Sequence, residues 1–107
     1  MPSAQQPPPI SDDQRAAALE RAAQARRVRA EIKELLKSGS LDFQGLLDRA
    51  AEDDLIGGIK IAAVLSSMPG TGKIKAKRMM EELGIADNRR LRGLGEKQRA
   101  ALLAEFS

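Results

Sequence analysis

Hydrophobic positions recur with helical spacing along most of the chain, and they predict amphipathic helices joined by short turns. The predicted helices cover about residues 12–37, 41–52, 59–68, 73–83 and 96–106, with a turn at 55–58. Only Ile59-Lys60-Ile61 alternates as a strand does, and three residues are too few to specify one. The predicted fold class is therefore all-α, with a long N-terminal helix followed by a compact helical domain.

The first predicted helix has two unlike halves. Ser11 and Gln14 fit a capping box at its start, and Ser38-Gly39 ends it. Its second half carries an apolar face that should pack on a core, formed by Ala25, Val28, Ile32, Leu35 and Leu36. In its first half Leu19 is the only large apolar residue, so that half should project. The predicted organisation is a disordered proline-rich tail at 1–10, a long helix within 11–38 and a compact domain at 39–107.

The composition excludes several kinds of chemistry. The 107 residues include no Cys and no His, which removes disulfides, thiolate zinc sites and the commonest general base near pH 7. We therefore expect no metal, no cofactor and no enzymatic activity. Phe43 and Phe106 are the only aromatic residues, which argues against a single-strand binder that stacks bases on rings. No apolar run is long enough for a membrane span, so we expect a soluble, cytoplasmic protein with no membrane partner.

The formal net charge of +3 conceals an uneven distribution. Residues 1–59 carry 8 basic and 10 acidic side chains, net −2, whereas residues 60–107 carry 10 basic and 5 acidic, net +5. The basic residues concentrate in three clusters, RRVR at 26–29, KIKAKR at 73–78 and RRLR at 89–92. Such clusters are typical of a protein that binds a polyanion, although charged residues also simply solubilise helices.

Cations also form a stripe along the first predicted helix, next to its apolar face rather than opposite it. The stripe contains Arg15, Arg26, Arg29, Lys33 and Lys37. Exposed cations beside a docking face are well placed to hold phosphates. Pairing within the helix, such as Glu20 with Arg27, is the alternative interpretation of these charges.

The segment from Pro69 to Lys73, Pro-Gly-Thr-Gly-Lys, lies between two predicted helices and is a candidate phosphate-binding loop. Two glycines in three positions permit positive φ angles and close approach to another surface. The helix that follows presents free N–H groups and the positive end of its dipole. Charge around the loop comes from Lys73, Lys75 and Lys77. A nucleotide-binding P-loop is excluded, because Ser67 and Ile74 stand where that motif requires Gly and Ser or Thr.

The strings MPGTGKIKAKRMMEELGI, ADNRRLRGLG and EKQRAALLAEF resemble the helix-two-turns-helix fold, which holds a nucleic-acid backbone through its glycine hairpin. A closer resemblance is to the actinobacterial-type integration host factors. It is carried by SDDQRAAALERAAQARRVRAEIK, GGIKIAAVLSSMPGTGKIKAKRMMEELGI, NRRLRGLG and EKQRAALLAEF, which with their spacing cover about residues 11–106. The resemblance implies a monomeric, nucleoid-associated protein that binds double-stranded DNA with low sequence specificity. It also implies roles in DNA bending, compaction and site-specific recombination.

These observations define a predicted DNA-binding site with two surfaces. One surface is the hairpin with the basic turn that follows, comprising Gly70, Thr71, Gly72, Lys73, Lys75, Lys77, Arg89, Arg90, Arg92 and Gly93. We expect the basic turn to lie near the hairpin, and Gly93 to permit close approach to DNA. The other surface is the first-helix stripe, represented by Arg15, Arg26 and Arg29, with Arg27 as an addition.

Two alternatives to DNA binding stay open. One is a ribosomal RNA-binding protein of the same fold, although such proteins usually carry a basic, glycine-rich extension that is missing after the last predicted helix. The other is a non-catalytic adaptor that docks through Pro7–Pro9 and the charged first helix. Competition between duplex DNA and structured RNA, and the salt dependence of binding, separate these possibilities.

Overall fold

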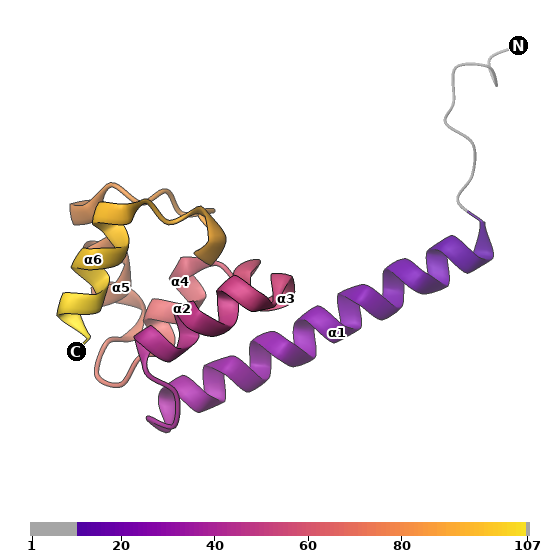
Figure 1. Cartoon of the computed structure of the whole chain (residues 1–107), viewed down its shortest axis with the longest axis horizontal. Coiled ribbons are helices and arrows are strands. Elements are labelled where there is room, and N and C mark those ends of the chain that lie inside the picture. Colours follow the sequence, from indigo (N-terminus) through magenta and orange to yellow (C-terminus); the bar gives the residue numbers. More distant parts are fainter. Residues whose placement is uncertain (1–10, 107) are drawn as a thin grey trace, which may run out of the picture.

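The computed structural model describes residues 11–106, and the tail predicted at 1–10 lies outside that range. The elements are α1 (Asp12–Lys37), α2 (Phe43–Glu52), α3 (Asp54–Gly57), α4 (Ile61–Ser67), α5 (Gly72–Leu83), the 3-10 helix η2 (Leu91–Gly93) and α6 (Glu96–Glu105). Across these described residues the backbone forms no strand, and one isolated antiparallel bridge joins Lys60 to Arg90. The all-α prediction, with a long first helix and a compact helical domain, is confirmed (Figure 1).

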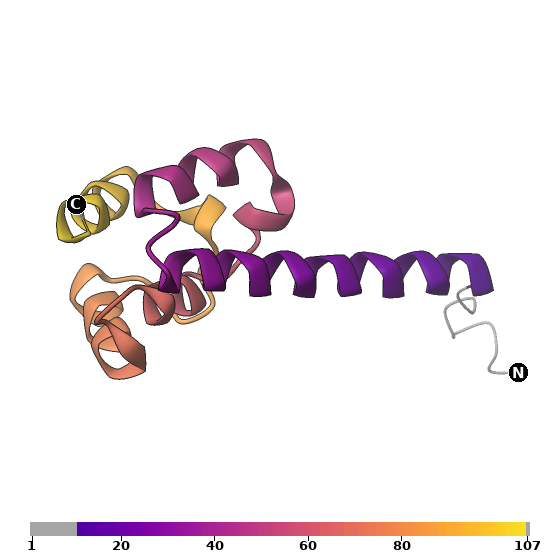
Figure 2. The same ribbon diagram turned by 90° about the horizontal axis from the view of Figure 1, so that it is seen from below.

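Helix α1 spans the residues that the sequence predicts, and only its second half packs against the domain. The Ser11 hydroxyl accepts a hydrogen bond from the Gln14 amide at 3.1 Å, and the Gln14 side chain accepts one from the Ser11 amide at 3.2 Å. Ile32 and Leu36 are buried, whereas Leu19 is 65% exposed. The first half therefore projects from the domain, as Figure 2 shows from a second direction.

The hydrophobic core lies where the second half of α1 meets the remaining helices. Its largest fully buried side chains are Phe43, Leu36, Leu46, Ile61, Leu65, Leu91, Leu102 and Val64. The rings of Phe43 and Phe106 have centroids 5.8 Å apart, which joins the start of α2 to the end of α6. Helices α4 and α5 pack against each other, and the short glycine hairpin between them completes the pair.

Two local features differ from the prediction. The segment predicted as a turn at 55–58 contains most of the short helix α3, because the Asp53 carboxylate accepts a hydrogen bond from the Leu55 amide at 2.9 Å and caps that helix. Helix α4 begins at Ile61 rather than at Ile59, because Lys60 is extended and takes part in the bridge. No helix among residues 11–106 combines the length and apolarity that crossing a bilayer requires.

Candidate nucleic-acid interface

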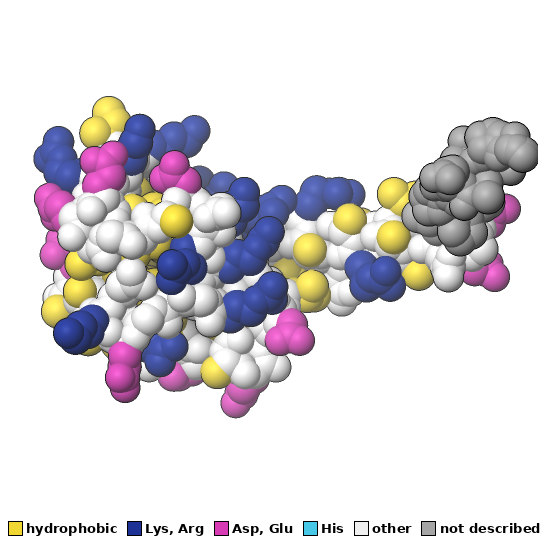
Figure 3. All heavy atoms as spheres, turned by 90° about the horizontal axis from the view of Figure 1, so that it is seen from above, with side chains coloured by type: hydrophobic (Ala, Val, Ile, Leu, Met, Phe, Trp, Pro, Cys, Tyr) yellow, Lys and Arg dark blue, Asp and Glu magenta, His cyan; other side chains and the backbone are white. Residues whose placement is uncertain are grey.

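Lys and Arg side chains gather on one face of the molecule. Figure 3 shows them over the compact domain, around its junction with α1 and along the projecting half of that helix. The basic residues of the candidate site come from three places in the fold: the glycine hairpin with α5, the turn at 88–93, and one flank of α1.

The glycine hairpin between α4 and α5 is an open backbone surface. Gly70 and Gly72 have φ angles of 76° and 70°, which glycine adopts without strain. A Cβ atom built on either glycine meets no heavy atom within 4 Å. Thr71 precedes α5 but makes no capping hydrogen bond through its side chain. The hairpin therefore has the open geometry that close approach of a phosphate group to a helix N-terminus requires.

Three lysines line a groove between α1, α4 and α5. The groove has a volume of about 470 Å³, and Lys33, Lys73 and Lys77 lie along it together with Asp87. Lys73 and Lys77 share one face of α5 because they are four residues apart. Lys75 is two residues from each of them and lies on the other flank of the helix. The structure thus brings two of the three predicted α5 lysines together and adds Lys33 of α1.

The second basic cluster surrounds the turn at 88–93, which pairs with the segment before α4. Two backbone hydrogen bonds of 3.0 Å join them, from the Ile61 amide to the Arg89 carbonyl and from the Leu91 amide to the Ile59 carbonyl. These bonds flank Lys60 and Arg90, which lie opposite each other and are both exposed. Lys60 was not among the predicted site residues. The alternation Ile59-Lys60-Ile61 was the one sequence signal that pointed to it.

Backbone carbonyl groups hold two arginines of this turn in place. Arg89 donates from Nη1 to the Gly93 carbonyl at 2.8 Å, and Arg90 donates from Nη1 to the Gly58 carbonyl. A guanidinium group has five N–H donors, so each arginine keeps donors for an external acceptor. The two cations are therefore presented from fixed positions, as recognition of phosphate oxygens requires.

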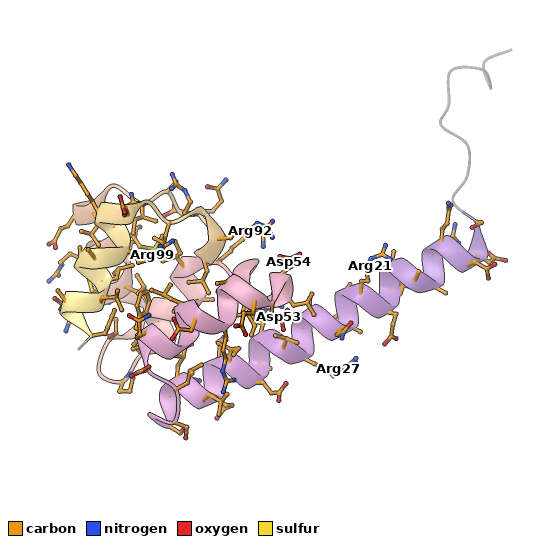
Figure 4. All side chains as sticks on the ribbon, in the orientation of Figure 1. Arg21, Arg27, Asp53, Asp54, Arg92 and Arg99 are labelled. Atoms are coloured by element: carbon orange, nitrogen blue, oxygen red, sulfur yellow. The ribbon has the colours of Figure 1, made fainter. Side chains whose placement is uncertain are left out.

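The expectation that Gly93 lets DNA approach stays a prediction, and the structure shows a second reason for glycine at this position. A Cβ atom at Gly93 would lie 2.9 Å from Cδ of Arg89, so the missing side chain makes room for Arg89. Arg92 lines a hollow of about 420 Å³ together with Asp54, Arg99 and others. Its Nη1 would lie 3.6 Å from a Cβ atom built on Gly58, the residue whose carbonyl accepts from Arg90. Figure 4 shows Arg92 and Asp54 on the same side of the domain, near α3. The surroundings of Arg92 are thus of mixed charge.

The predicted closeness of the hairpin and the basic turn is wrong. The bridge places the basic turn at Lys60, immediately before α4, whereas the hairpin at 68–71 follows the end of α4. The two turns therefore lie at opposite ends of α4, a helix of seven residues that spans about 10 Å. The groove with Lys33, Lys73 and Lys77 runs between them along α5 as far as Asp87.

The predicted stripe on α1 keeps most of its members together. Arg15, Arg26 and Arg29 are exposed at spacings that place them on one flank, and Lys33 continues this flank into the groove. Arg27 lies on a different flank and pairs with Glu20 at 3.6 Å, with both side chains mostly exposed. In Figure 4, Arg27 points away from the compact domain and Arg21 lies on the domain side of α1. The within-helix pairing interpretation is therefore correct for Arg27.

Comparisons with known proteins identify the family of this chain. The family model described as the S13-like H2TH domain matches residues 36–106, which defines the class of the compact domain as helix-two-turns-helix. Three curated relatives called integration host factor align over 92% of this chain. They come from Streptomyces coelicolor (50% identical, 92% of its length), Mycolicibacterium smegmatis (52%, 94%) and Mycobacterium tuberculosis (52%, 94%). The chain belongs to the integration host factor family.

A solved structure is also similar to this one. It is described as the structure of sIHF bound to an 8bp palindromic DNA, and it aligns with a TM-score of 0.78 and 48% sequence identity. The alignment covers 82% of this chain and 99% of that chain. The predicted resemblance to the integration host factors is confirmed.

Proposed function

We propose that this chain is a nucleoid-associated protein that binds double-stranded DNA with little sequence specificity. It bends or compacts DNA and thereby supports site-specific recombination, replication or transcription. The observation that carries the proposal is the similarity, at 48% identity and a TM-score of 0.78, to a chain solved in complex with a short DNA. It acts without catalysis and as a monomer, on DNA of the cytoplasmic nucleoid.

The charges of the candidate interface favour recognition of the phosphate backbone. The hairpin offers main-chain amides, and the groove offers three flexible lysines. Groups of this kind hold phosphates and carry no direct information about base sequence. Arg89 and Arg90 are the better candidates for a narrow minor groove, because their guanidinium groups are already oriented by backbone carbonyls.

The separation of the basic clusters supports bending of the duplex. The hairpin and the basic turn lie at opposite ends of α4, and the α1 flank extends the basic surface away from the domain. If a duplex bends to contact all three clusters, the additional ionic contacts offset the energy of deforming it.

A gel-shift titration on unrelated duplexes at two salt concentrations tests this proposal. Similar affinities for all sequences, with much weaker binding at the higher salt concentration, are expected. Structured RNA should compete poorly. Stronger binding to RNA would favour the ribosomal RNA-binding alternative, which shares the class of the compact domain. A folded sample that ignores duplex DNA even in dilute buffer would overturn the proposed function.

A further inference from the structure

Ile74 is an exposed apolar side chain among the cations that follow the glycine hairpin. Within residues 11–106 only two large hydrophobic side chains are exposed, Ile74 at 79% and Leu19 at 65%. Leu19 lies on the projecting half of α1, far along the chain from the hairpin. Ile74 is the third residue of α5 and directly follows Gly72 and Lys73. Ile74 therefore lies next to the glycine hairpin, on the first turn of α5.

The fold does not use the Ile74 side chain. Helix α5 packs on the core through Ala76, Met79 and Met80, and helical geometry places Ile74 on the opposite side. Its neighbours on that side, three and four residues along, are Lys77 and Arg78. Lys73 and Lys75 flank it in the sequence. Ile74 is thus surrounded by cations and is covered by nothing in the described chain.

A nucleic-acid duplex matches this arrangement of charge and apolar surface. Phosphates alternate along each strand with sugars, so cations that hold successive phosphates leave the side chain between them facing a sugar. The sugar of DNA presents an apolar C2′ methylene group, whereas the sugar of RNA presents a hydroxyl that donates and accepts hydrogen bonds. The Ile74 side chain can pack on the C2′ methylene group. It can neither donate a hydrogen bond to the 2′-hydroxyl of RNA nor accept one from it.

We infer that Ile74 packs against deoxyribose in the bound duplex and makes this protein prefer DNA over RNA. This inference rests on the proposed function, because it assigns a sugar specificity to the same hairpin surface. A 2′-hydroxyl pressed against the Ile74 side chain loses water and gains no partner, which weakens binding to RNA. Contact with a sugar also explains how an apolar residue serves a site that does not discriminate between bases.

The test compares DNA and RNA duplexes of one sequence by fluorescence anisotropy at one salt concentration. Ile74→Thr keeps the β-branched shape and supplies a hydroxyl, and we expect it to reduce the preference for DNA about fivefold. Ile74→Ala should weaken DNA binding about three- to tenfold without changing its salt dependence, because no cation is lost. DNA and RNA duplexes also differ in helix form, B and A respectively, but every variant is titrated with the same two duplexes. A change in the ratio of the DNA affinity to the RNA affinity is therefore due to the side chain at position 74.

Leu19→Thr and Leu19→Ala are the matched controls, since they alter the other exposed large hydrophobic residue. Leu19 shares the α1 flank of Arg15 and Arg26, so its variants are expected to affect the two duplexes equally, and neither control should change the DNA-to-RNA ratio. All four variants should melt close to the wild-type temperature because both positions are exposed. If Ile74 variants keep the wild-type affinities and ratio while Arg90→Ala weakens DNA binding, the inference fails and the proposed function stands. A wild-type protein that binds both duplexes equally also overturns the inference. If it binds neither duplex, the proposed function fails as well.

Discussion

Lys60 and Arg90 lie opposite each other in an antiparallel bridge, although the whole α4–α5 pair separates them in the sequence. The flanking hydrogen bonds run between their neighbours, which is the type of pairing that brings opposed side chains closest. Like charges in this position repel each other and destabilise the fold. Both residues are exposed, and we expect each of them to contact a phosphate of bound DNA.

Replacing Lys60 by Ala should therefore separate binding from stability. Loss of one phosphate contact should weaken duplex binding about three- to fivefold at low salt. Loss of the repulsion with Arg90 should leave the melting temperature unchanged or slightly higher. Anisotropy titration and thermal melting of the same sample measure both effects. A lower melting temperature with wild-type affinity would show that Lys60 serves only the fold.

The arginines of the basic turn should contribute unequally to DNA binding. Changing Arg89, Arg90 and Arg92 together to Ala should weaken duplex binding tenfold or more while the domain stays folded. Most of this loss should come from Arg89 and Arg90, because the hollow that Arg92 lines also contains the carboxylates of Asp48 and Asp54, which compete with phosphates for its charge. The single variants, titrated against one duplex and checked by circular dichroism, test the ranking. Equal losses at all three positions would contradict it.

The first helix offers a comparison within one RRVR cluster. Arg26→Ala and Arg29→Ala should each weaken duplex binding, because both residues lie on the flank that leads to Lys33 and the groove. Arg27→Ala should have little effect, since Arg27 lies on another flank and pairs with Glu20. The three variants change the net charge equally, so any difference between them reflects position. If Arg27→Ala weakens binding as much as the others, the helix contributes only through its overall charge.

The number of phosphates that the protein neutralises should be visible in the salt dependence. With about five to seven phosphate contacts, a plot of log K against log salt should have a slope of about −4.5 to −6. Measurement at four or more salt concentrations with a random-sequence duplex gives this value. A slope near −1 would mean that the basic surface described here does not engage the duplex.

The sequence predicted the helices well because their signals are local. A capping box at Ser11 and apolar faces at Ile32 and Leu36 define α1 without reference to the rest of the chain. The glycine hairpin was also predictable, since Gly70 and Gly72 need positive φ angles that few other residues adopt. The prediction that only half of α1 packs on the core followed from the single large apolar residue in its first half.

The placement of the basic turn was not predictable, because it depends on pairing between distant segments. The bridge at Lys60 involves a single residue from each side, and a pattern of three residues is too short to predict it. The contact between Gly93 and Arg89 was not predictable either. A Cβ atom at Gly93 would collide with the Arg89 side chain, which folds back over the turn. Contacts of this kind depend on three-dimensional packing and leave no periodic signal in the sequence.

The projecting half of α1 should be the least stable helical segment of the free protein. Its alanines and long side chains favour helix, but residues 12–24 bury no large apolar group, and Leu19 is 65% exposed. In hydrogen–deuterium exchange, amides of residues 16–24 should therefore exchange much faster than those near Ile32 and Leu36.

Duplex DNA should slow exchange in this segment if Arg15 and Arg26 contact phosphates, because ionic contacts then hold the helix. The paired Arg15→Ala, Arg26→Ala variant provides the control, and its exchange in this segment should be the same with and without DNA. Circular dichroism should show a small gain in helicity when DNA is added to the wild-type protein. Unchanged exchange in the wild type on saturation with duplex would exclude the first half of α1 from the interface, and would leave DNA bending to the two clusters at the ends of α4.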